Sequence, residues 1–231
     1  MEGKVKMRIV FDNYSEGYDD WYQTALGAFV DKVETDAAFS LLNPSKGQKV
    51  LDIGCGTGNF SFKLAELGCD VTGIDISDKM LEYAEEKMKA NLDICFKNMD
   101  VYNMDFEDNT FDSIISMATF EFIENEQEAY KNMLRVLKPN GTIVIGTIQK
   151  GGEWQKLYSS DVFKGSAYSF ATFKSKEELI SLDKDNFISL EECLYVPPNF
   201  EESKYTIENE GKYKEENGVG GFVCVSFKKI V

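Results

Sequence analysis

Residues 51–60 read LDIGCGTGNF, and this stretch decides the fold. It ends a short apolar run and carries glycines at every second position, Gly54, Gly56 and Gly58. Apolar residues at helical spacing follow: Phe60, Leu64, Ala65 and Leu67. The pattern predicts a buried strand, a tight loop and a helix. Glycine lets the backbone turn sharply and lets a ligand approach closely, and the first turn of a helix offers free N–H groups to that ligand.

The spacing of these glycines differs from that of two common nucleotide-binding loops. A dinucleotide fingerprint G-x-G-x-x-G would place its third glycine at position 59, which is Asn59. A P-loop is excluded because no Gly-Lys-Ser or Gly-Lys-Thr follows. The motif is G-x-G-x-G preceded by Asp52, and it closely resembles the first motif of S-adenosylmethionine-dependent methyltransferases of the Rossmann-like class. A plain glycine turn is the alternative.

The resemblance implies that this loop binds the cofactor S-adenosylmethionine. It places Asp52 near the methionyl amine of the cofactor. It also implies cofactor contacts for the loop residues Gly54, Cys55, Gly56 and Gly58.

Two further acids follow predicted strands. The strand over residues 70–75 ends in Asp75, and ligands of doubly wound sheets bind at the carboxyl ends of strands. A carboxylate there can accept hydrogen bonds from both hydroxyls of a ribose. In the resembled family this acid, with Ile76 beside it, binds the adenosine ribose. A third strand, 92–96, leads to Asp100 and Val101, at the family's adenine-binding position; Asp75 as a turn residue and Asp100 as a surface residue are the alternatives.

The resemblance extends over residues 48–148. A fourth strand, 111–117, ends at Met117, which the family places beside the reaction centre together with Phe120 and Glu121. A helix over 128–137, a Lys-Pro-Asn-Gly turn and a fifth strand over 142–148 complete the core. The resemblance implies an α/β, doubly wound, seven-stranded and mostly parallel sheet of order 3-2-1-4-5-7-6, with the last strand antiparallel.

The segments around this core are rich in aromatic residues. A helix over 26–42 follows aromatics that either pack on the sheet or form a lid over the cofactor: Tyr14, Tyr18, Trp21 and Tyr22. Residues 149–175, with Trp154, are either a packing insert or a substrate cap.

The sequence predicts four elements after this segment: a helix beginning at Ser175, a strand over 187–196, a solvated loop over 199–217 and a strand over 221–227. Residues 1–12 match no pattern.

The composition favours one globular domain. The chain has 231 residues, of which 43% are hydrophobic. We expect a helical lid over 1–45, a cofactor-binding core over 46–148, a small cap and helix over 149–186 after the fifth strand, and a strand pair over 187–231. No apolar run is long enough to span a bilayer and no signal peptide is evident, so a cytoplasmic protein is expected.

The charged and reactive residues exclude several functions. There is no histidine, and the five cysteines are scattered without a C-x-x-C pair, which argues against a metal site and against a disulfide framework. A net charge of −15 disfavours nucleic acid and anionic membranes as partners.

The functional prediction is methyl transfer from S-adenosylmethionine to a small-molecule acceptor, by in-line displacement at the sulfonium methyl. Tyr18 and Glu121 are candidates for a general base. Candidate residues of the substrate pocket are Tyr14, Tyr18, Trp21, Tyr22, Phe120 and Trp154. An NAD-dependent oxidoreductase and a non-catalytic S-adenosylmethionine-binding protein are the alternatives. The acceptor, the methylated atom and the oligomeric state are left open by the sequence.

Overall fold

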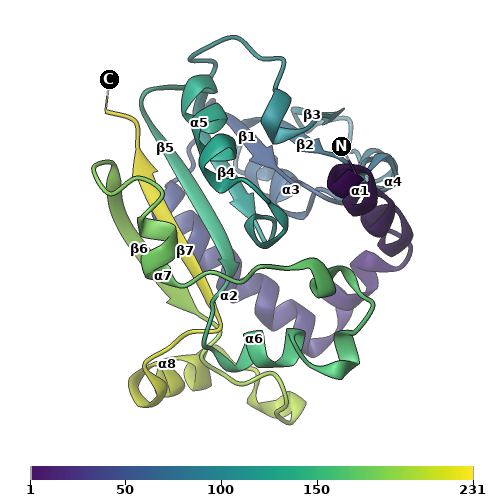
Figure 1. The fold of residues 1–231 in the computed structure, drawn as a ribbon, viewed down its shortest axis with the longest axis vertical. Helices are drawn as coiled ribbons and strands as arrows, with labels where there is room; N and C mark the ends of the chain where they lie inside the picture. The colour runs from purple at the N-terminus through teal and green to yellow at the C-terminus, as the bar shows by residue number, and fades with distance from the viewer. Residues whose placement is uncertain (1, 231) are drawn as a thin grey trace.

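A seven-stranded sheet forms the centre of the molecule. The computed structural model describes residues 2–230, and the side chains of residues 7–216 and 218–230. The strands are Lys49–Ile53 (β1), Asp70–Asp75 (β2), Ile94–Asn98 (β3), Phe111–Met117 (β4), Leu137–Ile148 (β5), Phe187–Cys193 (β6) and Phe222–Lys228 (β7). Their order is β3-β2-β1-β4-β5-β7-β6, and only β7 runs antiparallel to its neighbours (Figure 1). The predicted fold class is confirmed.

Helices cover both faces of this sheet. In Figure 1, α5 (Glu126–Val136) lies in front of it, while α2 (Ala25–Leu42) and α3 (Asn59–Glu66) lie behind. Side chains of successive strand residues point to opposite faces, so Val144 packs in the core beneath α2, whereas its neighbours Ile143 and Ile145 pack beneath α5. A sheet buried on both faces explains why β1 reads as an apolar run rather than an alternating one.

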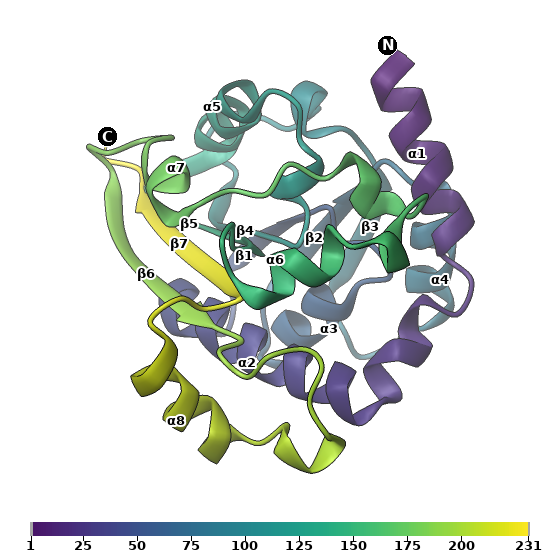
Figure 2. The same ribbon diagram turned by 60° about the horizontal axis from the view of Figure 1, so that its bottom comes forward.

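The remaining helices lie around the sheet, some of them near the carboxyl ends of the parallel strands (Figure 1 and Figure 2). They are α1 (Glu2–Tyr14), α4 (Asp78–Glu86), α6 (Glu153–Tyr158), α7 (Lys176–Ile180) and α8 (Ile207–Asn217). Figure 2 shows α6 and the chain after it crossing above those strand ends, between α1 and α7. Local caps fix where two of these helices begin. Ser77 accepts a hydrogen bond from the Met80 N–H, and Ser175 forms the predicted capping box with Glu178.

The solvated loop predicted over 199–217 is wrong, because α8 occupies most of it. Thr206 caps this helix, and Glu210 anchors it to the chain beyond β6. The two carboxylate oxygens of Glu210 accept the N–H groups of Tyr195 (3.0 Å) and Val196 (3.1 Å). The helix has few apolar residues and an internal glycine, so its stability comes from this tertiary contact, which sequence periodicity does not show.

Smaller departures concern the ends of strands. The third strand is 94–98 rather than 92–96, and the sixth ends at Cys193, where Leu194 takes a positive φ of 60°. The predicted turn at 138–141 lies within β5, whose pairing with β4 shifts register there. Residues 1–12, which match no pattern, belong to α1 within the described part of the chain.

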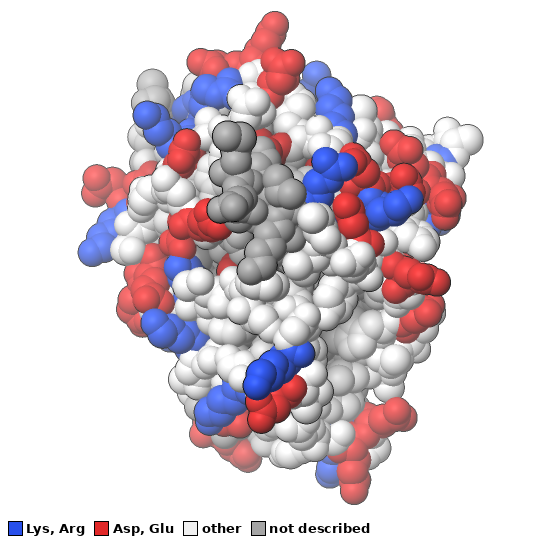
Figure 3. All heavy atoms as spheres, turned by 45° about the vertical axis from the view of Figure 1, so that its right-hand side comes forward, with Lys and Arg blue, Asp and Glu red and all other residues white. Residues whose placement is uncertain are grey.

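The surface charge is mixed on the face shown in Figure 3, where Lys and Arg lie among Asp and Glu rather than in a patch. The exclusion of nucleic acid remains a prediction. Within residues 2–230, none of the helices combines the length and the apolar content that a membrane span requires.

We expect Glu210→Ala to lower the free energy of unfolding by about 1–3 kcal/mol, because two backbone N–H groups lose a charged acceptor. Urea denaturation followed by circular dichroism measures this. Glu215→Ala, an exposed position on the same helix, is the control and should change the free energy by less than about 0.5 kcal/mol. Equal stability of the two variants would show that α8 does not depend on Glu210.

Candidate functional site

The glycine loop between β1 and α3 forms the floor of the site. The N–H groups of Gly54 (2.8 Å) and Cys55 (3.0 Å) both donate to the carbonyl oxygen of Ile74 in β2. Gly54 has a φ of 69°, and a Cβ there would lie 2.3 Å from Oγ1 of Thr119. A side chain at position 54 would therefore clash with the end of β4, which explains the glycine.

Asp75 joins this loop to the next helix. Its Oδ2 accepts the N–H of Gly56 and its Oδ1 accepts the N–H of Ser77, each at 2.9 Å. Burial raises the pKa of Asp75, and these backbone hydrogen bonds oppose that shift. The carboxylate is thereby held in one orientation at the carboxyl end of β2.

Asp52 lies beneath the loop, with only 2% of its surface exposed. Its Oδ2 accepts a hydrogen bond from Oγ of Ser61 at 2.6 Å. Burial raises its pKa to about 7, the Ser61 hydrogen bond opposes the shift, and the charge of Asp75 adds to it. None of the ion pairs among the described side chains involves Asp52, so a cation bound from the cavity would stabilise its charge.

A cavity opens above these residues. The predicted cofactor and substrate residues that line it are Asp52, Gly54, Cys55, Gly56, Asp75, Ile76, Asp100, Val101, Met117, Tyr18 and Tyr22. Gly58 is the N-cap of α3, behind the wall of the cavity. At the far side, Oδ1 of Asp100 accepts the Tyr102 N–H at 3.0 Å, which places Val101 against the cavity.

Four of the predicted pocket residues do not line the cavity. Trp154 is 2% exposed, and its Nε1 donates to the Val196 carbonyl oxygen at 3.0 Å. Phe120 is fully buried in the core beneath α5. Tyr14 is largely exposed, and Trp21 packs edge-on against Tyr22. Large aromatics serve the core as readily as a pocket, and the sequence does not separate these uses.

Glu121 also lies outside the cavity wall, in the short 3-10 helix Phe120–Phe122 (η3). It is 1% exposed, and its Oε2 accepts a hydrogen bond from Oγ1 of Thr147 at 2.8 Å. Oε1 has no hydrogen-bond partner among the described residues. Burial raises the pKa of Glu121 to about 7, and the Thr147 hydrogen bond opposes the shift.

Sequence reasoning missed several residues of the cavity wall, namely Met7, Phe11, Glu34, Thr119 and Phe122. Glu34 left a signal, because it stands midway between Val30 and Ala38 at i, i+4 spacing on the buried face of α2. A carboxylate on an apolar helix face is unusual and often functional.

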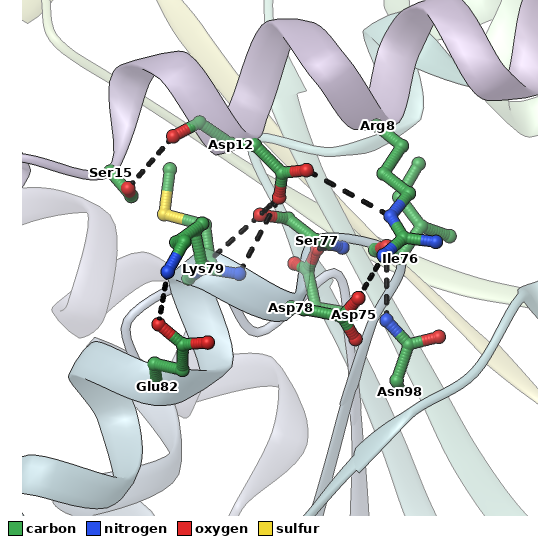
Figure 4. A network of polar contacts seen from close by, with 11 residues as sticks. Arg8, Asp12, Ser15, Asp75, Ile76, Ser77, Asp78, Lys79, Glu82 and Asn98 are labelled. Carbon is green, nitrogen blue, oxygen red and sulfur yellow. Dashed lines mark hydrogen bonds and ion pairs between the residues drawn. The ribbon is translucent and has the colours of Figure 1, made fainter.

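Helix α1 lies against the start of α4 (Figure 4), and its residues Met7 and Phe11 line the cavity. Oδ1 of Asp12 accepts a hydrogen bond from Oγ of Ser77 at 2.6 Å, at the start of α4 and two residues from Asp75. Arg8 pairs with both Asp12 and Asp78. These contacts hold α1 so that its Phe11 lies against the cavity and edge-on to Phe122, with ring centroids 5.1 Å apart.

The fold and this site define a Rossmann-like nucleotide-binding protein of the class that binds ligands at the carboxyl ends of parallel strands. Residues 44–209 match the family model of the methyltransferase domain. The chain belongs to this family of S-adenosylmethionine-dependent methyltransferases.

The chain is also similar to individual proteins. The chain is 32% identical over 224 residues to an uncharacterized protein of Methanocaldococcus jannaschii, covering 96% of this chain and 99% of that protein. It is 32% identical over 192 residues to a demethylmenaquinone methyltransferase of Staphylococcus epidermidis, covering 80% and 78%. The fold is similar to that of a methyltransferase from Thermotoga maritima described as a possible histamine N-methyltransferase, with a TM-score of 0.73, 22% identity, and coverage of 96% and 99%.

The residues present fit the family's cofactor. A Cβ at Gly56 would meet no atom within 4 Å, so the loop backbone is open to the cavity. The fixed carboxylate of Asp75 suits a pair of hydroxyls, and buried Asp52 suits an amine. Among the described side chains, those of residues 7–216 and 218–230, no group of three or more Cys, Asp or Glu is arranged to hold a metal ion.

We expect the ligand-free protein to lose stability as the pH rises through 7, in part because of Glu121. Its folded pKa of about 7 exceeds the value of 4.5 for a free glutamate, so its contribution is complete below about pH 4 and lost at alkaline pH. Glu121→Gln should flatten the profile of melting temperature between pH 5 and 8. Glu107→Gln, at an exposed position, should leave the profile unchanged.

We expect Asp12→Ala to speed the dissociation of S-adenosylhomocysteine about fivefold, because α1 loses about 1 kcal/mol of docking free energy. Stopped-flow fluorescence measures the rate. Asp36→Ala, an exposed position on α2, is the control. An unchanged rate in Asp12→Ala would mean that α1 does not hold the ligand in.

Proposed function

We propose that this chain transfers the methyl group of S-adenosylmethionine to a small-molecule acceptor by in-line displacement. The observation that carries the proposal is the position of Asp75. Its carboxylate is fixed by the N–H groups of Gly56 and Ser77 at the rim of a cavity, directly above a G-x-G-x-G loop.

Each part of the cofactor has a proposed partner. Asp75 and Ile76 bind the ribose, and Asp100 and Val101 bind the adenine. Asp52 lies beside the amine, where a positive charge favours its ionised form. Gly54, Cys55, Gly56 and Met117 border the rest of the cofactor.

The cofactor supplies a methyl group that its sulfonium makes electrophilic. The chain contributes alignment and exclusion of water, and alignment alone is worth ~7–11 kcal/mol. Phe11 and Phe122 form an apolar wall for this purpose. Tyr18 lines the cavity, but desolvation raises its pKa to about 12, so it is protonated at neutral pH and acts as a hydrogen-bond donor rather than a base.

The observations bear differently on the two alternatives, an NAD-dependent oxidoreductase and a non-catalytic S-adenosylmethionine-binding protein. Membership of the methyltransferase family and the missing third fingerprint glycine argue against a nicotinamide-dependent oxidoreductase. A non-catalytic protein would bind the same cofactor in the same cavity, so only turnover distinguishes it. Release of S-adenosylhomocysteine in the presence of an acceptor would exclude that alternative.

We expect S-adenosylmethionine and S-adenosylhomocysteine to bind in calorimetric titrations, and NAD not to bind. Asp75→Asn should weaken the binding of both by about tenfold or more, since the ribose loses a charged acceptor worth about 1.5–3 kcal/mol. Asp105→Asn, on an exposed loop, should bind as the unmodified chain does. Binding of NAD alone would overturn the methyl-transfer function, and unchanged affinity in Asp75→Asn would remove Asp75 from the site.

A further inference from the structure

One side of the cavity is lined by groups to which we assign no cofactor contact. Tyr18 and Tyr22 come from the 3-10 helix Tyr18–Gln23 (η1), and Glu34 comes from α2. The rings of Tyr18 and Tyr22 lie with centroids 6.1 Å apart. We call Tyr18, Tyr22 and Glu34 the acceptor wall.

A second layer of polar groups lies behind the acceptor wall. Tyr158 and Tyr168 stack with ring centroids 4.1 Å apart. Burial raises the pKa of both tyrosines, and the charges of Glu34 and Glu121 raise it further. Both tyrosines also interact with Tyr18, so groups from five separate segments converge here. Glu121 adds a carboxylate oxygen that is buried without a hydrogen-bond partner among the described residues.

The charged side chains that line the described part of the cavity are all acidic. Its described lining includes five carboxylates and no lysine or arginine: Glu34, Asp52, Asp75, Asp100 and Glu124. Lys63 lowers the pKa of Glu34, but it pairs with Asp31 and donates to Thr35. Glu34 itself has no ion-pair partner among the side chains of residues 7–216 and 218–230.

This arrangement costs free energy unless a cation enters. Burial raises the pKa of Glu34 well above its ordinary value, and the charges of Glu121 and Asp31 raise it further. An anionic acceptor would be repelled, and a neutral one would leave the Glu34 carboxylate without a counter-ion. An ammonium group satisfies a carboxylate directly and is attracted to the faces of tyrosine rings.

We propose that the methyl acceptor is a small amine, bound as its ammonium ion by Glu34 and the rings of Tyr18 and Tyr22. This inference rests on the methyl-transfer function proposed above. Glu34 lines the cavity from α2, and the two tyrosines line the same cavity.

Glu34 also provides a route for the proton. The ammonium nitrogen gives one proton to the Glu34 carboxylate, which frees its lone pair. The nitrogen then forms a bond to the methyl carbon while the carbon–sulfur bond breaks, and that electron pair stays on sulfur. The products are a methylated ammonium ion and a neutral thioether, and the proton on Glu34 returns to solvent.

The test is calorimetric titration of the full chain, saturated with S-adenosylhomocysteine, with matched pairs of ligands. The probes are ethylamine, butylamine, cadaverine and phenethylamine, each beside the alcohol of the same skeleton. We expect at least one amine to bind tenfold or more tightly than its alcohol. The same amine, incubated with S-adenosylmethionine, should gain one methyl group by mass spectrometry. Failure of every amine to bind more tightly than its alcohol would overturn the proposal.

Glu34→Gln keeps the shape of the side chain and removes its charge. We expect it to bind S-adenosylhomocysteine normally, which shows that it is folded, and to lose at least tenfold in affinity for the amine. Asp36→Asn, exposed on the same helix, should behave as the unmodified chain. Unchanged amine affinity in Glu34→Gln would overturn the assignment. If S-adenosylhomocysteine does not bind the unmodified chain at all, it is instead the methyl-transfer function that fails.

Discussion

The carboxylate of Asp75 is the constraint on which the rest of the site depends. Its two oxygens tie the N–H of Gly56 in the glycine loop to the N–H of Ser77 at the start of α4. The Ser77 hydroxyl in turn caps α4 and donates to Asp12 of α1. One side chain therefore sets the position of the loop, of a helix terminus and of the helix that closes the cavity.

A second constraint is electrostatic. Asp52 and Glu121 are buried and Glu34 is half-buried, and burial is the first cause of the raised pKa of each. A domain selected only for stability would replace such groups with apolar ones. Two of these groups, Asp52 and Glu34, line the cavity, and a cofactor that carries an amine and a sulfonium supplies positive charge there.

The backbone is strained at the end of β4, beside the glycine loop. Ala118, at the end of β4, has a positive φ of 49°, which a residue with a Cβ rarely adopts. Its N–H donates to the Gly146 carbonyl oxygen in β5, and the next residue, Thr119, donates to the Gly54 carbonyl oxygen in the loop. The bend at Ala118 thus brings the end of β4 against the glycine loop, where the two together border the cavity.

Local signals account for much of what could be predicted. The apolar run before Gly54, the glycine spacing and the acids after β2 and β3 are short-range patterns, because a buried parallel strand and the loop that follows it are encoded within a few residues. Through the family resemblance that they carry, these patterns predicted the order of the sheet. Of the ten predicted cofactor residues, all but Gly58 line the cavity. The capping box at Ser175 was readable for the same reason.

Tertiary structure alone decided the rest, since these features depend on partners distant in sequence. Helix α8 exists because Glu210 reaches the backbone beyond β6, and Trp154 belongs to the core because its ring nitrogen finds the Val196 carbonyl oxygen. The sequence by itself determined a methyltransferase fold and its cofactor loop. Only folding brought α1, η1 and Glu34 together over the strand ends, because the free energy that places them comes from packing against residues far along the chain.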